Sequence, residues 1–209
     1  MIHSSDAQGH YLVTANLGTV YVQVVGLGSM NNCFSLQDFL HDLHGKGYCQ
    51  FIFDLKECRG FDSSFMGVLI GLCNRRSSEP SGSTGAPSSP SPSNISASTS
   101  DGDGQGGTSS DPGARSASHR VIIVNCSDEQ RKLLSSVGVD RVVELCQQPI
   151  NFPVPEAKLS RVKQEPVGVE RQLRSIVKAH QDLIQLEGAN EEKFGAFVNL
   201  VKQELEKHG

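Results

Sequence analysis

A long stretch of small and polar residues divides this chain and limits what it can fold into. Residues 77–118 consist mostly of Ser, Gly and Pro, and Ile95 is their one large aliphatic residue. Such a segment cannot bury enough apolar surface to offset the entropy lost on ordering, so we predict a disordered insertion. The sequence after it, residues 119–146, is too short to form a core alone. Both flanks should therefore belong to one domain, because the closure cost of a long surface loop grows slowly with its length.

The two flanks carry alternating strand and helix patterns. Strands are predicted at 11–16, 20–25, 51–55, 121–125 and 141–145. One helix is predicted over 63–74, and two more are predicted to begin at capping boxes, formed by Ser35 with Asp38 and by Ser127 with Gln130. This alternation predicts a mainly parallel sheet with right-handed crossovers, preceded by an antiparallel hairpin. The fold class is therefore α/β, with a small mixed sheet flanked by helices.

The C-terminal part of the chain is organised differently. Residues 147–168 contain four prolines and little periodicity, which predicts an extended linker. Over 169–207 the pattern becomes amphipathic and helical, with one heptad register through Leu173, Ile176, His180, Leu183, Glu187, Asn190, Phe194, Phe197 and Val201. Because the register continues through Gly188, one long helix is preferred to a hairpin. This helix either packs on the domain or mediates a homodimer.

Composition argues against nucleic-acid binding, a membrane-spanning segment, secretion and a metal site. A net charge of −4 offers no basic field for nucleic acid or an anionic membrane, and no apolar run is long enough to span a bilayer. The N-terminal sequence MIHSSDAQGH lacks the features of a signal peptide, so we expect a cytoplasmic protein with reduced, mostly buried cysteines. His41 and His44 have no carboxylate or thiol cluster beside them. We therefore expect neither a metal site nor a cofactor.

The residues around position 63 suggest a functional corner. A predicted strand ends at Asp54, a polar loop follows, and Asp62-Ser63-Ser64 begins an apolar helix. Asp and Ser are favoured at this position as helix caps, and capping alone can explain them. A hydroxyl there would also tolerate a phosphate, because helix N-termini favour anions. Beside Asp62 the added charge would repel, so phosphorylation would release a partner docked on this corner.

The same corner carries a family resemblance. DLKECRGFDSSFMGVLIGL resembles the signature of STAS domains, in which a strand ending Asp-Leu and a short loop precede Asp-Ser-Ser-Gly-Leu-Gly and an apolar helix. VQVVGLGSMNNCFSLQDFLHDL and HRVIIVNCSDEQRKLLSSVGVDRVVEL resemble the flanking parts of that fold. The resemblance covers residues 11–146 apart from the insertion. It implies a STAS-like domain over 1–146, followed by the 147–168 linker and the 169–207 helix.

The resemblance implies an anti-sigma factor antagonist of a bacterial signalling circuit. In such proteins the hydroxyl after the motif Asp is phosphorylated by an anti-sigma serine kinase, and the unphosphorylated form binds that kinase and frees a sigma factor. By position the phosphorylated hydroxyl is Ser63, with Ser64 as the alternative. The implied partner-binding residues are Asp54, Asp62, Ser63, Ser64, Phe65 and Met66.

Two departures from the family pattern leave other functions open. Phe65 stands where the family usually has Gly, so its ring either alters kinase access or anchors a partner. Gly26-Leu27-Gly28-Ser29 replaces the usual Gly-x-Leu-Asp. An alternative is a constitutive scaffold or accessory subunit, for example of a transport ATPase, that oligomerises through its C-terminal helix. An enzyme is not expected, because both the G-x-S-x-G elbow and the P-loop are missing.

Overall fold

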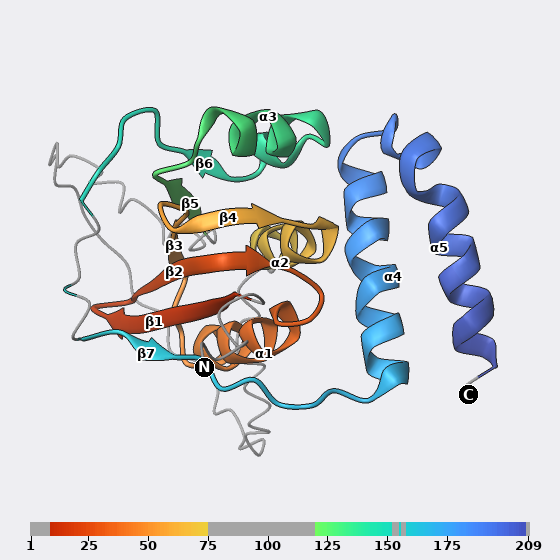
Figure 1. The fold of residues 1–209 in the computed structure, drawn as a ribbon, viewed down its shortest axis with the longest axis horizontal. Helices are drawn as coiled ribbons and strands as arrows, with labels where there is room; N and C mark the ends of the chain where they lie inside the picture. The colour runs from red at the N-terminus through yellow and green to blue at the C-terminus, as the bar shows by residue number, and fades with distance from the viewer. Residues whose placement is uncertain (1–8, 75–119, 152–154, 156–157, 208–209) are drawn as a thin grey trace, which may run out of the picture.

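The protein is an α/β fold in which helices flank a mixed sheet (Figure 1). The computed structural model describes residues 9–74, 120–151, 155 and 158–207. The arrangement confirms the predicted fold class. The predicted disordered insertion, 77–118, lies outside the described residues. Within the described part of the chain, no helix combines the length and the apolarity needed to cross a membrane.

The sheet is mixed because an antiparallel pair precedes the parallel strands. Its strands are β1 His10–Asn16, β2 Thr19–Gly28, β3 Gln50–Asp54, β4 Cys58–Phe61, β5 Arg120–Val124, β6 Glu144–Leu145 and β7 Ser160–Arg161. The order across the sheet is β6-β5-β3-β2-β1-β7, and β4 pairs with β2 off this path. β2, β3, β5 and β6 run parallel, whereas β1 is antiparallel to both β2 and β7. The predicted hairpin and parallel strands are therefore present.

The helices begin at caps that the sequence only partly identifies. They are α1 Cys33–Gly45, α2 Ser63–Cys73, α3 Asp128–Ser136, α4 Val169–Leu186 and α5 Asn190–Glu206. The capping box at Ser127 and Gln130 and the cap at Asp62 are confirmed. The capping box predicted at Ser35 is wrong: α1 begins three residues earlier, after Asn32, and the Ser35 hydroxyl instead accepts the backbone N–H of Glu165.

Three short segments differ from the prediction for reasons of tertiary context. The strand predicted over 141–145 is shorter than expected: Arg141 ends a 3-10 helix, Val139–Arg141, and only Glu144–Leu145 (β6) pairs with β5. The polar loop before α2 contains β4, which pairs with the end of β2. The predicted linker contains β7, which adds an edge strand beside β1. Each of these pairings joins residues distant in sequence, which local patterns cannot show.

The C-terminal region is helical, as predicted, but it forms two helices instead of one. α4 ends at Leu186, and the backbone becomes extended at Glu187 (φ −143, ψ 116). The completely buried side chain of Asn190 donates to the backbone oxygens of Leu183 (2.7 Å) and Val137 (3.0 Å). These bonds satisfy a carbonyl at the end of α4 and fix the turn. In this C-terminal hairpin, α4 packs on α2, and α5 packs on the side of α4 away from α2 (Figure 1).

Candidate functional site

Asp62 joins the end of β4, the start of α2 and the loop after β2. Its Oδ1 accepts the backbone N–H groups of Ser64 (2.9 Å) and Phe65 (3.2 Å), and its Oδ2 accepts that of Met30 (2.9 Å). The backbone N–H of Asp62 donates to the oxygen of Gly28 (3.0 Å). One carboxylate therefore caps the helix and fixes the neighbouring loop, so this corner is rigid before any partner arrives.

The hydroxyl of Ser63 is bonded to the C-terminal hairpin. Its Oγ lies 2.8 Å from Nε2 of His180, and Nδ1 of that ring lies 2.8 Å from the backbone oxygen of Ile176. Because a carbonyl oxygen only accepts, Nδ1 carries the proton, and in the neutral ring Nε2 accepts from the Ser63 hydroxyl. Ser63 is half-buried and His180 is 5% exposed. The predicted phosphorylation site is therefore partly covered by α4.

The Ser63–His180 pair suits a structural contact better than a catalytic one. A serine bonded to an imidazole of fixed tautomer is an arrangement that can activate a nucleophile. However, the first-turn N–H groups of Ser64 and Phe65, which could bind an oxyanion, are already bonded to Asp62. The imidazole is also packed against the rings of Phe194 and Phe197, with centroids 5.2 and 4.8 Å away.

Most of the predicted partner-binding residues lie inside the fold. Asp54, Ser64, Phe65 and Met66 are 1%, 8%, 0% and 4% exposed, respectively. The carboxylate of Asp54 accepts from the side chain of Asn125 (2.8 Å) and the backbone N–H of Lys56 (3.0 Å), so it organises loops. These four side chains are buried in this conformation, and their direct contact with a partner stays a prediction. Asp62 and Ser63 are the two of the six that reach the surface.

Phe65 is a core residue, so its ring is not exposed to a kinase or a partner in this conformation. The ring stacks on Tyr11 (centroids 6.2 Å apart), meets Phe53 edge-on (6.1 Å) and contacts Phe61 (5.4 Å). A Cβ on Gly28 would lie 3.0 Å from this ring. Gly28 in β2 therefore leaves room for the bulky ring at position 65, where the family that this sequence resembles usually has Gly.

Two exposed apolar side chains border the corner and were not predicted to be part of it. Leu27 and Met30 are 41% and 40% exposed. Leu27 pairs with Gly60 of β4, and the backbone of Met30 is bonded to Asp62, so both belong to the same rigid unit as Ser63. The sequence signal for Leu27 was the Gly-Leu-Gly-Ser departure, which falls at the end of β2. Together with Asp62 and Ser63 they form what we call the corner surface.

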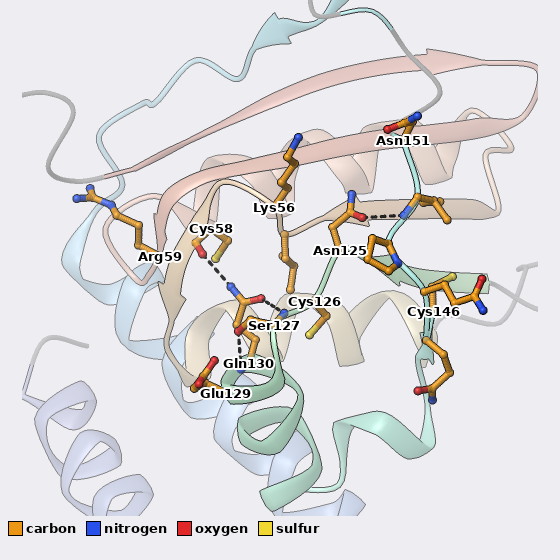
Figure 2. A pocket seen from close by; sticks show the side chains of 15 residues that line it. Lys56, Cys58, Arg59, Asn125, Cys126, Ser127, Glu129, Gln130, Cys146 and Asn151 are labelled. Atoms are coloured by element: carbon orange, nitrogen blue, oxygen red, sulfur yellow. Dashed lines mark hydrogen bonds between the residues drawn. The ribbon is translucent and has the colours of Figure 1, made fainter.

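A separate cavity of about 600 Å³ lies where the loops after β3 and β5 meet the segment after β6 (Figure 2). The carboxyl end of parallel strands is a common place for ligands. Here, however, Gln130 bonds the oxygen of Cys58 and the N–H of Ser127, both at 2.8 Å. The Asn125 amide oxygen accepts the N–H of Ile150 (2.9 Å). These polar groups are bonded to each other, so this wall indicates no particular ligand.

We expect two thiols in this cavity, those of Cys58 and Cys126, to react slowly. Burial raises the pKa values of Cys58 and Cys126 above the ordinary thiol range. Little thiolate is then present at pH 7, so iodoacetamide should alkylate both more slowly than free cysteine, and the rate should rise with pH. A peptide-level mass spectrometry time course at pH 7 and pH 9 measures this. Alkylation at pH 7 as fast as that of free cysteine would contradict it.

The corner surface is the stronger candidate because it combines a fixed geometry, a modifiable hydroxyl and exposed apolar groups. Within the described part of the chain, no group of three or more His, Cys, Asp or Glu residues could hold a metal ion. Comparison with known protein families and with curated proteins finds no match for this chain. The function is therefore inferred from the geometry of the corner together with the sequence motif that it contains.

Proposed function

We propose that this chain is a STAS-like protein-binding module of the anti-sigma factor antagonist type, whose partner is released by phosphorylation of Ser63. The supporting observation is the corner surface, where Asp62 holds a modifiable serine next to two exposed apolar side chains, Leu27 and Met30. Exposed apolar groups beside a polar rim are typical of docking sites. In the proposed circuit the partner is an anti-sigma serine kinase in the bacterial cytoplasm.

Phosphorylation at Ser63 changes both charge and shape at this surface. The kinase transfers the γ-phosphoryl group of ATP to Oγ, which breaks the β–γ phosphoanhydride bond and releases ADP, and the hydroxyl proton passes to solvent. The product carries between about one and a half and two negative charges directly beside Asp62. Since Oγ and Nε2 of His180 are 2.8 Å apart, a phosphoryl group cannot enter without breaking that bond. Modification therefore adds repulsion and moves α4 relative to the corner.

Replacing Ser63 by Asp should abolish capture of the partner, whereas Ser63→Ala should retain it. The added carboxylate beside Asp62 repels an acceptor-rich partner surface, and we expect roughly a tenfold or greater loss of bound partner. Affinity purification with the wild-type, Ser63→Ala and Ser63→Asp chains, compared by mass spectrometry, measures this. Ser160→Asp is the matched control, because Ser160 is exposed on β7.

Phosphopeptide mapping of the chain from cells is the complementary measurement. We expect phosphate on Ser63, and Ser64 remains the alternative acceptor although it is 8% exposed. If residue 63 is never modified and capture is the same for Ser63→Asp and Ser160→Asp, the proposed switch does not operate.

A constitutive scaffold is the second candidate, and one observation favours it. Phe197 and Leu200 on α5 are 44% and 63% exposed, so the hairpin presents apolar side chains to a possible second copy. In that case the full chain should be dimeric by light scattering, and Leu200→Glu should make it monomeric. A monomeric wild-type chain at all concentrations tested would remove this alternative.

A further inference from the structure

Helix α2 is apolar on both sides. It has no charged residue, and its buried residues are Ser64, Phe65, Met66, Gly67, Val68, Leu69, Ile70 and Leu72. A helix that is apolar all round needs cover on both faces. The sheet covers one face. On the other, Ser64, Gly67, Val68 and Gly71 lie at helical spacing beneath α4. We call these four residues the outer face of α2.

The outer face is shaped to receive a helix with a small residue at the crossing. A Cβ on Gly67 would lie only 2.2 Å from Cβ of Ala179, so the two backbones are in close contact there. One residue further along α4, His180 reaches the hydroxyl of Ser63. A helix that binds this groove therefore needs a small side chain at the position of Ala179, and a hydrogen-bonding side chain at the next position, that of His180.

The cover that α4 provides is incompletely packed. A cavity of about 270 Å³ remains between α1, α2 and α4, and Ser175 and Asp182 of α4 line it. The exposed side chain of Lys178 also lines this cavity, so the cavity is open to solvent and α4 is not close-packed on α2 there. The carboxylate of Asp182, with a side chain only 6% exposed, is neutralised from the rim by Lys178. Contacts inside a chain that contain such polar groups resemble transient interfaces.

The other polar links between the hairpin and the domain are mostly at its edges. Arg141 pairs with Glu187 and Arg171 with Asp38, and both arginine side chains are more than half exposed, at 62% and 59%. Exposed ion pairs of this kind contribute little to stability. α5 packs chiefly on α4, so the two helices can leave α2 together once the buried bond from Asn190 to the oxygen of Val137 is broken.

We propose that the outer face of α2 is a helix-binding surface, and that an amphipathic helix of a partner protein replaces α4 on it. The occupant is defined by α4 itself: a small residue at the position of Ala179, and a larger apolar one at the position of Ser175 to fill the cavity. This inference rests on the proposed function, because Ser63 lies at the end of the same groove. Release of α4 frees the Ser63 hydroxyl for the kinase.

Two substitutions in the full chain test whether α4 is a removable cover. Ala179→Leu places a large side chain against the α2 backbone and should lift α4, so amide hydrogen exchange in 63–73 and 169–186 should quicken roughly tenfold or more. Ser175→Leu fills the cavity and should slow exchange in the same segments. Unchanged exchange in Ala179→Leu, or faster exchange in Ser175→Leu, would overturn the inference.

A peptide tests whether the uncovered face accepts a helix from outside. The probe is a fluorescent peptide of residues 169–207 carrying Leu at position 175, measured by anisotropy. It should bind the Ala179→Leu chain roughly tenfold or more tightly than the wild type, whose groove is occupied. The same peptide carrying Leu at position 179 should not bind. Equal binding of both peptides, or no binding to an Ala179→Leu chain that keeps its circular dichroism spectrum and quickened exchange, contradicts the proposal.

These results separate the two proposals. If the peptide with Leu at position 175 binds as expected while Ser63→Asp has no effect on partner capture, the helix-binding surface is supported and the phosphorylation switch is contradicted. If Ser63→Asp abolishes capture while Ala179→Leu changes neither hydrogen exchange nor peptide binding, the phosphorylation switch is supported and the helix-binding surface is contradicted.

Discussion

Replacing Phe65 by Ala should lower the free energy of unfolding by about 3–5 kcal/mol, the range typical of a large aromatic residue lost from a core. The side chain is fully buried and contacts the rings of Tyr11, Phe53 and Phe61. These neighbours belong to three different strands, so the gap cannot close by a local shift. Urea denaturation followed by circular dichroism measures the change.

Phe197→Ala is the matched control for this substitution. Its ring is 44% exposed, so removing it should cost about 1 kcal/mol or less. Similar losses for the two variants would mean that Phe65 does not occupy the core as described.

Asp62→Ala should be the second most damaging of these substitutions, at about 2 kcal/mol. The change removes the acceptor of three backbone N–H groups, those of Met30, Ser64 and Phe65. Asp62→Asn keeps one oxygen acceptor and should lose about half as much. Urea denaturation gives the total, and hydrogen exchange at the three amides shows which bonds are lost.

Asp128→Ala controls for the loss of negative charge at a helix start. Asp128 lies in the first turn of α3, where Ser127 is the cap, and its side chain is exposed. Its removal should change stability by about 0.5 kcal/mol or less. An equal effect at positions 62 and 128 would show that the charge matters at Asp62, and that the bonds to α2 and Met30 do not.

Local features of this fold were predictable from the sequence. The cap at Asp62 and the capping box of α3 depend on residues within three positions of each other, and both are present. Strand and helix periodicity likewise gave the α/β class, because the parallel strands alternate with their helices along the chain. The cap of α1 was missed because the side chain of Asn32 bonds Tyr11 and Leu27 and not the helix N–H groups.

Features that depend on contacts between distant residues were not predictable. Ser63 and His180 are 117 positions apart, so no local pattern could show that one covers the other. The division of the C-terminal helix depends on Asn190 reaching Val137 of another element, and the turn left the heptad register in phase. The burial of Phe65 depends on Gly28 in the same way.

The path of the chain into α4 sets how strong a competing helix must be. β7 pairs with β1, Val162 donates to the oxygen of Tyr11 (2.9 Å), and the N–H of Glu165 bonds Ser35 (3.1 Å), so the chain is anchored almost up to Gly168. After release, α4 would stay tethered to the domain by a few residues, which keeps its effective concentration at the groove in the millimolar range. A partner helix at micromolar concentration must therefore bind the groove about a thousandfold more tightly than α4 to remain on it. The tether thus excludes helices that bind the groove only weakly.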